Sequence, residues 1–316
     1  MEGPYPTKEV IEAAAKRIAP YVHRTPVLTS SSINAMIGAE IFLKCENFQK
    51  IGAFKYRGAT NAVLQLSADE KKNGVATHSS GNHAQALALA AKINKLKAYI
   101  VMPENSSSVK INAVKGYGAE VITCAPNQEA RESTLADIIK RTGATLVHPY
   151  NNYSIIAGQA TAAKELIEEV KDLDIIMAPV GGGGLLSGTA LSTHYFSPKS
   201  AVIAGEPANA DDAVRSLKEG KIVPANPPST IADGLLTSLG DKTFDIIRKH
   251  VKEIVTVSEE EIVAAMRLVW ERMKIIIEPS SAVPVAAAIK NKQSFKGKRI
   301  GIVISGGNVD LNKLPF

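Results

Sequence analysis

The sequence Asp174-Ile175-Ile176-Met177-Ala178-Pro179-Val180-Gly181-Gly182-Gly183-Gly184-Leu185 joins an apolar run of strand length to four glycines. Backbone without side chains can wrap closely around a compact anion, and phosphate fits this pattern best. A dinucleotide fingerprint is excluded because Ser187 stands at its last glycine position, and the Gly-Lys-Ser/Thr ending of a Walker loop is absent. A flexible turn is the alternative, although four consecutive glycines carry a heavy entropic cost.

Short apolar runs alternate with amphipathic stretches on both sides of this loop. Strands are expected at 98–102, 120–123, 145–147, 175–180 and 202–204, and helices at 128–142, 157–170 and 185–194. This alternation predicts an α/β fold built on parallel sheets. Ser258-Glu259-Glu260-Glu261 is a capping-box pattern, so a further helix is expected from there to about Met273.

The composition is that of a globular enzyme rather than a nucleic-acid or membrane protein. The chain has 316 residues, 45% of them hydrophobic, which allows a large core and favours two domains. Its net charge of +6 is spread along the chain, so nucleic acid is not an expected partner, whereas anionic substrates are. Cys45 and Cys124 lack metal-ligand spacing and are expected to be reduced buried thiols. The polar stretch from Met1 to Lys8 is unlike a signal peptide and no apolar run is long enough to span a membrane, so we expect a cytoplasmic protein.

Lys55 lies in the run Gly52-Ala53-Phe54-Lys55-Tyr56-Arg57-Gly58-Ala59, among aromatic and small residues. Desolvation disfavours an ammonium group and lowers its pKa, which favours the neutral amine that a Schiff-base lysine needs. From this run alone, a surface lysine with a packed stem is the alternative.

Two more segments place polar groups where a strand is expected to end. Thr77-His78-Ser79-Ser80-Gly81-Asn82-His83-Ala84-Gln85 follows a β-like run and precedes an alanine-rich helical stretch. The free N–H groups of such a helix start suit a substrate carboxylate. Ile300-Gly301-Ile302-Val303-Ile304-Ser305-Gly306-Gly307-Asn308 is a buried-strand pattern that ends in a hydroxyl and two glycines.

The order of these segments resembles the fold-type II family of pyridoxal-phosphate enzymes, and within it the branch of serine racemases and serine/threonine dehydratases. The eukaryotic serine racemases are most similar, and the fungal hydroxyaspartate dehydratases are almost as near. The matching segments are 25–29, 44–49, 52–59, 79–83, 181–184, 232–234, 278–280 and 305–310. The resemblance implies a tryptophan synthase β-like fold, with a large domain of residues 1–73 and 151–316, a small domain of residues 74–150, and the cofactor in the cleft.

The resemblance also implies roles for individual residues. Lys55 would hold pyridoxal phosphate covalently and act as the base on one face of the substrate Cα, and Ser80 would act on the other face, as racemisation requires. Ser305 would face the pyridine nitrogen and leave it neutral, and Asn82 would bind the ring hydroxyl. Phe54 would pack beneath the ring, although a core phenylalanine is the alternative. The implied cofactor contacts are Phe54, Lys55, Asn82, Tyr150, Gly181, Gly182, Gly183, Gly184, Leu185 and Ser305.

The resemblance further implies sites for substrate, metal and nucleotide. The substrate carboxylate would lie against Ser79, Ser80, Gly81, Asn82 and His83, with Arg131 as a helper, although Arg131 could equally be a solvated arginine of a charged helix. Mg²⁺, Ca²⁺ or Mn²⁺ would bind Glu206, the carbonyl of Ala210 and Asp212. Allosteric activation by ATP is implied, and its site would include Ser30, Ser31, Ser32, Lys50, Ile51, Gln85, Lys110 and Tyr117. The match is partial, because Ile51 stands where a hydroxyl residue can occur and Tyr150 replaces an asparagine of some relatives.

The expected function is a homodimeric serine racemase that interconverts L- and D-serine and also eliminates water from serine, giving pyruvate and ammonia. The alternative is a dehydratase of serine, threonine or 3-hydroxyaspartate with little racemisation. A catalytically silent sensor of ATP or an amino acid is a third interpretation, against which the intact Lys55, Ser80 and Ser305 argue.

Overall fold

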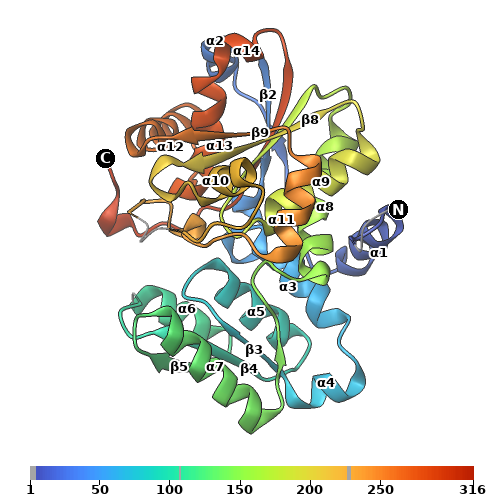
Figure 1. Ribbon diagram of the computed structural model, residues 1–316, viewed down its shortest axis with the longest axis vertical. Helices are drawn as coiled ribbons and strands as arrows, with labels where there is room; N and C mark the ends of the chain where they lie inside the picture. The colour runs from blue at the N-terminus through green and yellow to red at the C-terminus, as the bar shows by residue number, and fades with distance from the viewer. Residues whose placement is uncertain (1–4, 107, 226–228) are drawn as a thin grey trace.

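A computed structural model describes residues 5–106, 108–225 and 229–316 and contains two sheets (Figure 1). The strands of the large sheet lie in the order β1 (Val27–Leu28), β2 (Glu40–Cys45), β10 (Arg299–Ile304), β7 (Ile175–Pro179), β8 (Ala201–Pro207) and β9 (Glu253–Val257). The strands of the small sheet lie in the order β5 (Glu120–Cys124), β4 (Ala98–Pro103), β3 (Val75–His78) and β6 (Thr145–Leu146). In these sheets β1 pairs antiparallel with β2 and the other pairings are parallel, which confirms the expected α/β fold.

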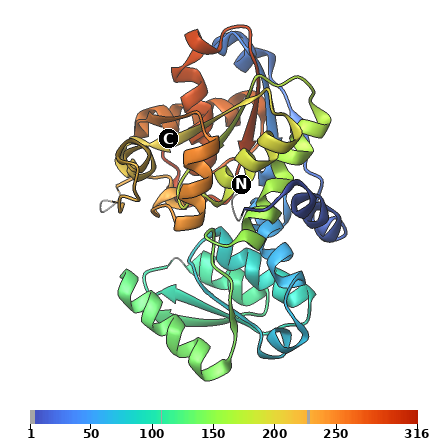
Figure 2. The ribbon, with the colours of Figure 1, turned by 45° about the vertical axis from the view of Figure 1, so that its right-hand side comes forward.

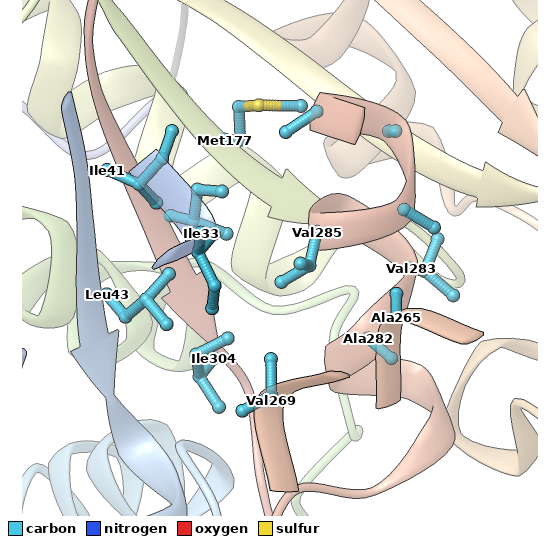
Figure 3. Close-up of a cluster of buried hydrophobic side chains, with 14 of the residues drawn as sticks. Ile33, Ile41, Leu43, Met177, Ala265, Val269, Ala282, Val283, Val285 and Ile304 are labelled. Carbon is cyan, nitrogen blue, oxygen red and sulfur yellow. The ribbon is translucent and has the colours of Figure 1, made fainter. Parts of the chain in front are cut away.

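Helices cover both faces of the large sheet. Because successive side chains of a strand point to opposite sides, alternate residues of one strand belong to different clusters. Ile300, Ile302 and Ile304 of β10 pack with α12 (Glu259–Met273) and α13 (Pro279–Lys290), and Figure 3 shows Ile304 beside Val269 and Ala282 in this cluster. Val303, between them in the sequence, belongs to the cluster on the other face with α8 (Tyr153–Glu169), α9 (Gly184–Phe196) and α11 (Asp241–His250).

The small sheet alternates in the same way. Val75 and Ile100 pack with α3 (Lys55–Leu64) and α5 (Asn82–Ile93), whereas Ala76 and Val101 pack with α7 (Gln128–Thr142). Figure 2 shows the two lobes with α3 and α8 at their junction. The two sheets support the expected division at residues 74 and 150, which we retain as a proposal. The helix that begins with Lys55 precedes this boundary but packs against the small sheet.

Local sequence explains where the best-defined helices begin and end. The predicted helix 128–142 is α7. The Asn127 side chain caps its start by accepting a hydrogen bond from Ala130 N, and the helix ends at Gly143, which has φ 70°. The predicted capping box of Ser258 is present at the start of α12. The helix predicted at 157–170 starts earlier, because the Asn152 side chain caps α8 by accepting from Ser154 N and Ile155 N.

The remaining elements complete the chain between these parts. They are α1 (Lys8–Ile18), α2 (Ser31–Ile37), α4 (Ala68–Asn73), α6 (Ser108–Gly116), α10 (Asp212–Glu219), α14 (Lys292–Phe295) and the 3₁₀ turns η1 (Glu46–Phe48), η2 (Lys50–Gly52), η3 (Ala208–Ala210), η4 (Asp233–Leu235) and η5 (Leu311–Lys313). Both cysteines are buried free thiols, as predicted. Among the helices of the described ranges, none has both the length and the apolar character needed to cross a membrane. Residues 1–4, to which part of the signal-peptide prediction refers, lie outside the described residues.

Candidate active site

A cavity of about 910 Å³ lies between the two sheets, where the carboxyl ends of β3, β7 and β10 meet. Ligands of open α/β sheets bind at such strand ends. The cavity is lined by every residue to which the sequence assigned a cofactor or substrate role, namely Phe54, Lys55, Ser79, Ser80, Gly81, Asn82, His83, Arg131, Tyr150, Gly181, Gly182, Gly183, Gly184, Leu185 and Ser305.

Backbone pairing joins the lysine segment to the end of β10. Ala53 forms an isolated antiparallel bridge with Gly306, and Phe54 N donates to Ser305 O at 2.9 Å. This pairing places Lys55, at the start of α3, beside Ser305, although 250 positions separate them in the sequence.

The Lys55 amine is poised to lose its proton close to neutral pH. Its Nζ donates to the carbonyl of Pro149 at 2.9 Å and lies 5.3 Å from the centre of the Phe54 ring. Burial lowers the pKa of Lys55 to about 8, and the nearby carboxylate of Glu278 opposes this shift. The side-chain environment predicted for Lys55 is therefore present.

The glycine loop has the close packing that excludes side chains. A Cβ on Gly181 would lie 2.7 Å from Leu235 Cα, and one on Gly182 would lie 2.4 Å from the Tyr150 ring. Gly183 has φ +86°, and α9 starts immediately after it. The first N–H groups of a helix lack intrahelical acceptors and attract anions, so the loop fits a phosphate group.

Ser305 is buried and linked to a residue to which the sequence assigned no role. Its hydroxyl lies 2.9 Å from the hydroxyl of Ser281, and the Ser281 hydroxyl also donates to Gly306 O at 2.7 Å. Ser281 thereby fixes the position of Ser305 against the cavity. The sequence signal for Ser281 is its place in the first turn of α13, directly after the Glu278-Pro279-Ser280 segment.

The loop after β3 offers neutral groups to the cavity. Ser79 Oγ accepts from Gly81 N at 3.3 Å, and the space beside the Gly81 Cα is open. The His83 ring is buried, with Nε2 3.0 Å from Val147 O and Nδ1 without a hydrogen-bond partner among the described residues. Burial, assisted by Lys55, lowers the pKa of His83 to about 3, so the ring is neutral at neutral pH.

Arg131 and Asn82 have contrasting surroundings. The Nε atom of Arg131 is buried and makes no hydrogen bond with the described residues, so this guanidinium has capacity for a ligand anion. Asn82 is bound: its Nδ2 donates to Glu278 Oε1 and Oε2 at 3.0 and 3.1 Å, and its Oδ1 accepts from Asn308 at 2.8 Å. Sequence reasoning assigned no role to Glu278 or Asn308, because each is far from Asn82 along the chain.

The predicted metal ligands lie outside this cavity, at the end of β8. Glu206 and Asp212 are buried, and the Glu206 carboxylate accepts from Ala213 N and Val214 N at 2.7 and 2.9 Å. Asp212 Oδ2 is buried without a partner among the described residues. Two carboxylates and a carbonyl are hard oxygen ligands of the kind that divalent cations prefer.

The predicted nucleotide residues do not gather in one place. Gln85 and Lys110 line the cavity, and Lys110 pairs with Asp233 at 2.7 Å. Ile51 and Tyr117 pack at the edge of the small-sheet core, and Lys50 Nζ lies 5.8 Å from the Tyr56 ring. Ser30, Ser31 and Ser32 lie at the start of α2, which Figure 1 places at the top of the upper lobe, whereas α5 and α6 lie in the lower lobe. One subunit alone does not bring all eight residues together.

Comparison with known proteins agrees with this arrangement. The family model described as "Pyridoxal-phosphate dependent enzyme" matches residues 18–306. A beta-hydroxyaspartate dehydratase of Paracoccus denitrificans is 50% identical over 311 residues, which cover 98% of this chain and 99% of that protein. A serine racemase of Dictyostelium discoideum is 52% identical over 98% of this chain and 96% of its own length. The crystal structure of the Dictyostelium discoideum serine racemase superposes with a TM-score of 0.93, covering 96% of this chain and 99% of the other.

Proposed function

This chain belongs to the family of pyridoxal-phosphate dependent enzymes, and from that premise we propose that it interconverts L- and D-serine and also eliminates water from serine, giving pyruvate and ammonia. The observation that carries the proposal is the composition of the cavity wall. Lys55 enters it from the segment paired with β10 of the large sheet, and Ser80 enters it from the end of β3 in the small sheet. Racemisation requires one acid/base group on each face of the substrate Cα, and two groups that reach the cavity from different lobes could supply them.

The residues around the cavity fit the cofactor. Lys55 would hold it covalently, Gly181–Leu185 would hold its phosphate, and Ser305 would face its ring nitrogen. Bound pyridoxal phosphate would delocalise the electron pair that remains on the substrate Cα after proton loss. Lys55 would take the Cα proton on one face, and the Ser80 hydroxyl would give a proton on the other. Loss of the β-hydroxyl instead of reprotonation would lead to pyruvate.

The test is incubation of the purified holoenzyme with L-serine, with chiral chromatography of serine and quantification of pyruvate in the same sample. We expect D-serine and pyruvate together. Pyruvate without D-serine would overturn the racemase assignment and favour a dehydratase. Lys55→Ala is the control, since it removes the group on which both reactions depend.

A second function, dehydration of 3-hydroxyaspartate, is favoured by one observation. Arg131 lines the same cavity, and its buried Nε lacks a partner among the described residues. A substrate with a second carboxylate would supply that partner. The measurement is the ratio of kcat/KM for 3-hydroxyaspartate and for L-serine, and a ratio far above one would assign the dehydratase as the main activity.

For the metal site, we propose Mg²⁺, Ca²⁺ or Mn²⁺ at Glu206, the Ala210 carbonyl and Asp212. The buried Asp212 Oδ2, which has no hydrogen-bond partner within residues 5–106, 108–225 and 229–316, supports it. Binding of a cation to the folded state raises the unfolding temperature by mass action. Titration of the metal-free protein with MgCl₂ should raise the Tm of the native protein and leave that of Asp212→Asn unchanged; equal shifts in both would exclude this site.

ATP activation, a homodimer and a cytoplasmic location also remain proposals. Because Ser30–Ser32 lie far from Gln85 and Lys110 within one subunit, an ATP site using both groups requires a second copy of the chain. Sedimentation with and without ATP tests both proposals together. A monomer that is activated by ATP would exclude the shared site.

A further inference from the structure

Glu278 is a buried carboxylate inside the cavity, and it makes hydrogen bonds to two other segments of the chain. It precedes α13, and 3% of its surface is exposed. Its oxygens accept from the Asn82 side chain, on the first residue of α5, and from Asn308 N at 3.1 Å. Glu278 therefore connects the helix that follows β3 of the small sheet to the segment that follows β10 of the large sheet.

The hydrogen bonds fix which way the Asn82 carboxamide faces. Asn308 Nδ2 donates to the carbonyl of Ile51 at 2.8 Å, and a carbonyl can only accept, so the Asn308 nitrogen is identified without ambiguity. The same nitrogen lies 2.8 Å from the Asn82 oxygen, which must accept. The Asn82 nitrogen is then directed at the oxygens of Glu278.

The two distances from Asn82 Nδ2 to Glu278 are nearly equal, at 3.0 Å to Oε1 and 3.1 Å to Oε2. The nitrogen therefore faces the middle of the carboxylate, where a single N–H serves both oxygens. An amide nitrogen carries two hydrogens, so the second N–H of Asn82 is left for a ligand in the cavity.

The backbone beside this network is shaped to admit Asn308. A Cβ on Gly52 would lie 2.8 Å from Asn308 Oδ1, and Gly52 has φ +69°. Ile51, whose carbonyl accepts from Asn308, has φ 60°, which is uncommon for a β-branched residue. Ile51 and Gly52 lie just before Lys55 in the chain, so the same stretch of backbone contacts this network and leads into the lysine.

We propose that Glu278 is a positioning residue that holds the Asn82 carboxamide with its second N–H available as a donor to the cofactor. The proposal rests on the proposed function, since it takes pyridoxal phosphate as the cofactor and Asn82 as one of its contacts. Glu278 also lies close enough to Lys55 to affect the ionisation of its amine.

Glu278→Gln tests this proposal. A glutamine offers one acceptor oxygen where Asn82 and Asn308 N need two, so the Asn82 carboxamide loses the partner of its nitrogen and is held only through its oxygen, by Asn308. A hydrogen bond to a charged group contributes enough that we expect the affinity of the cofactor-free protein for pyridoxal phosphate to fall about 10- to 100-fold. We also expect the absorption spectrum of the loaded protein to change. Glu278→Asp, which keeps the carboxylate, should recover part of both.

The matched control is Glu132→Gln, which removes a different carboxylate from the wall of the same cavity, where Glu132 accepts from Gln128 and not from Asn82. It should keep the native spectrum. If both variants change affinity and spectrum alike, the loss of a carboxylate from the cavity explains both results, and the proposal fails. A Glu278→Gln protein with native affinity and spectrum overturns it as well.

A second variant guards against misfolding of Glu278→Gln. Asn308→Asp cannot donate to Asn82, so it should turn the Asn82 nitrogen away from Glu278 and reproduce the loss of affinity; native affinity in this variant contradicts the proposal. The test of Glu278 can succeed or fail independently of the proposed reaction. A native protein that binds the cofactor but forms neither D-serine nor pyruvate refutes the reaction and leaves the role of Glu278 standing.

Discussion

Arg57, two residues after Lys55, forms a fully buried ion pair with Glu46. Arg57 Nε lies 2.7 Å from Glu46 Oε2, and Nη2 donates to Oε1 at 2.8 Å. Glu165 on α8 accepts from the same guanidinium and from Lys44, so two cations and two carboxylates balance in the interior. The cluster joins α3 to β2 and α8, and thereby fixes the helix that begins with Lys55.

Removal of Arg57 should therefore destabilise the whole protein. Arg57→Met leaves the buried Glu46 carboxylate without its ion-pair partner and leaves Glu165 with Lys44 alone, and breaking a buried pair in this way costs about 3–5 kcal/mol. Urea unfolding of the cofactor-free protein measures the effect. Arg248→Met is the control, because Arg248 pairs with Asp245 at the exposed surface and should change the free energy of unfolding by less than about 1 kcal/mol. Equal effects of the two substitutions would show that the buried cluster adds no stability.

Alanine substitutions at Gly183 and Gly220 compare the stability lost through backbone strain with the stability lost through side-chain crowding. Both have positive φ, +86° and +70°, but a Cβ on Gly183 would lie 2.8 Å from each of Leu239, Thr243 and Ile247, whereas nothing lies within 4 Å of one on Gly220. Gly220→Ala should cost about 1–2 kcal/mol of stability, and Gly183→Ala about 1–3 kcal/mol more. Thermal unfolding without cofactor compares them, and equal losses would refute the close packing of the glycine loop.

These positions show what local sequence can predict. The glycine loop, the helix start after β3 and the segment after β10 were predictable because each is a strand end with an unusual run of small or polar residues. The capping box at Ser258 and the Asn127 start of α7 are equally local. Each of these features depends on residues within a few positions of one another.

The contacts that could not be predicted from the sequence join segments that are far apart along the chain. The pairing of Arg57 with Glu165 spans 108 positions, and that of Asn82 with Glu278 spans 196. No periodicity or spacing predicts such pairs, because each depends on how elements far apart in the chain pack together. The earlier start of α8 was missed for a local reason, since the Asn152 cap lies in a polar stretch without apolar periodicity.

The lowered pKa of Lys55 predicts a pH-dependent stability of the cofactor-free protein. The folded-state pKa is about 8 against 10.5 for the ordinary group, so between these values the unfolded chain binds more protons and stability rises with pH. Relative to Lys55→Met, the native protein should gain about 1 kcal/mol between pH 7 and pH 9. Urea unfolding of both proteins at the two pH values cancels the other titrating groups, and a difference that stays constant would place the Lys55 pKa outside this window.

Ser80→Ala should separate racemisation from elimination. Without the hydroxyl, no group after β3 at this position can give or take a proton, and general acid/base catalysis contributes at least about 100-fold. Racemisation in both directions should fall by that factor, while elimination from the serine antipode whose Cα proton faces Lys55 should persist. Chiral chromatography and pyruvate release measured on each antipode give the answer. Equal loss of all reactions would refute the assignment of two bases.

Arg131 should decide the preference between serine and 3-hydroxyaspartate. Its buried Nε has no partner in the part of the chain that the structure describes, so it has capacity for a carboxylate. A charge-assisted hydrogen bond contributes about 1.5–3 kcal/mol, which corresponds to roughly 10- to 150-fold in kcat/KM. If Arg131 binds the carboxylate that serine lacks, Arg131→Met should lower kcat/KM by this factor for 3-hydroxyaspartate and leave serine nearly unchanged. If both substrates lose equally, Arg131 binds the carboxylate that they share. Arg141→Met, an exposed position on the same helix, controls for loss of positive charge on α7 and should leave both values unchanged.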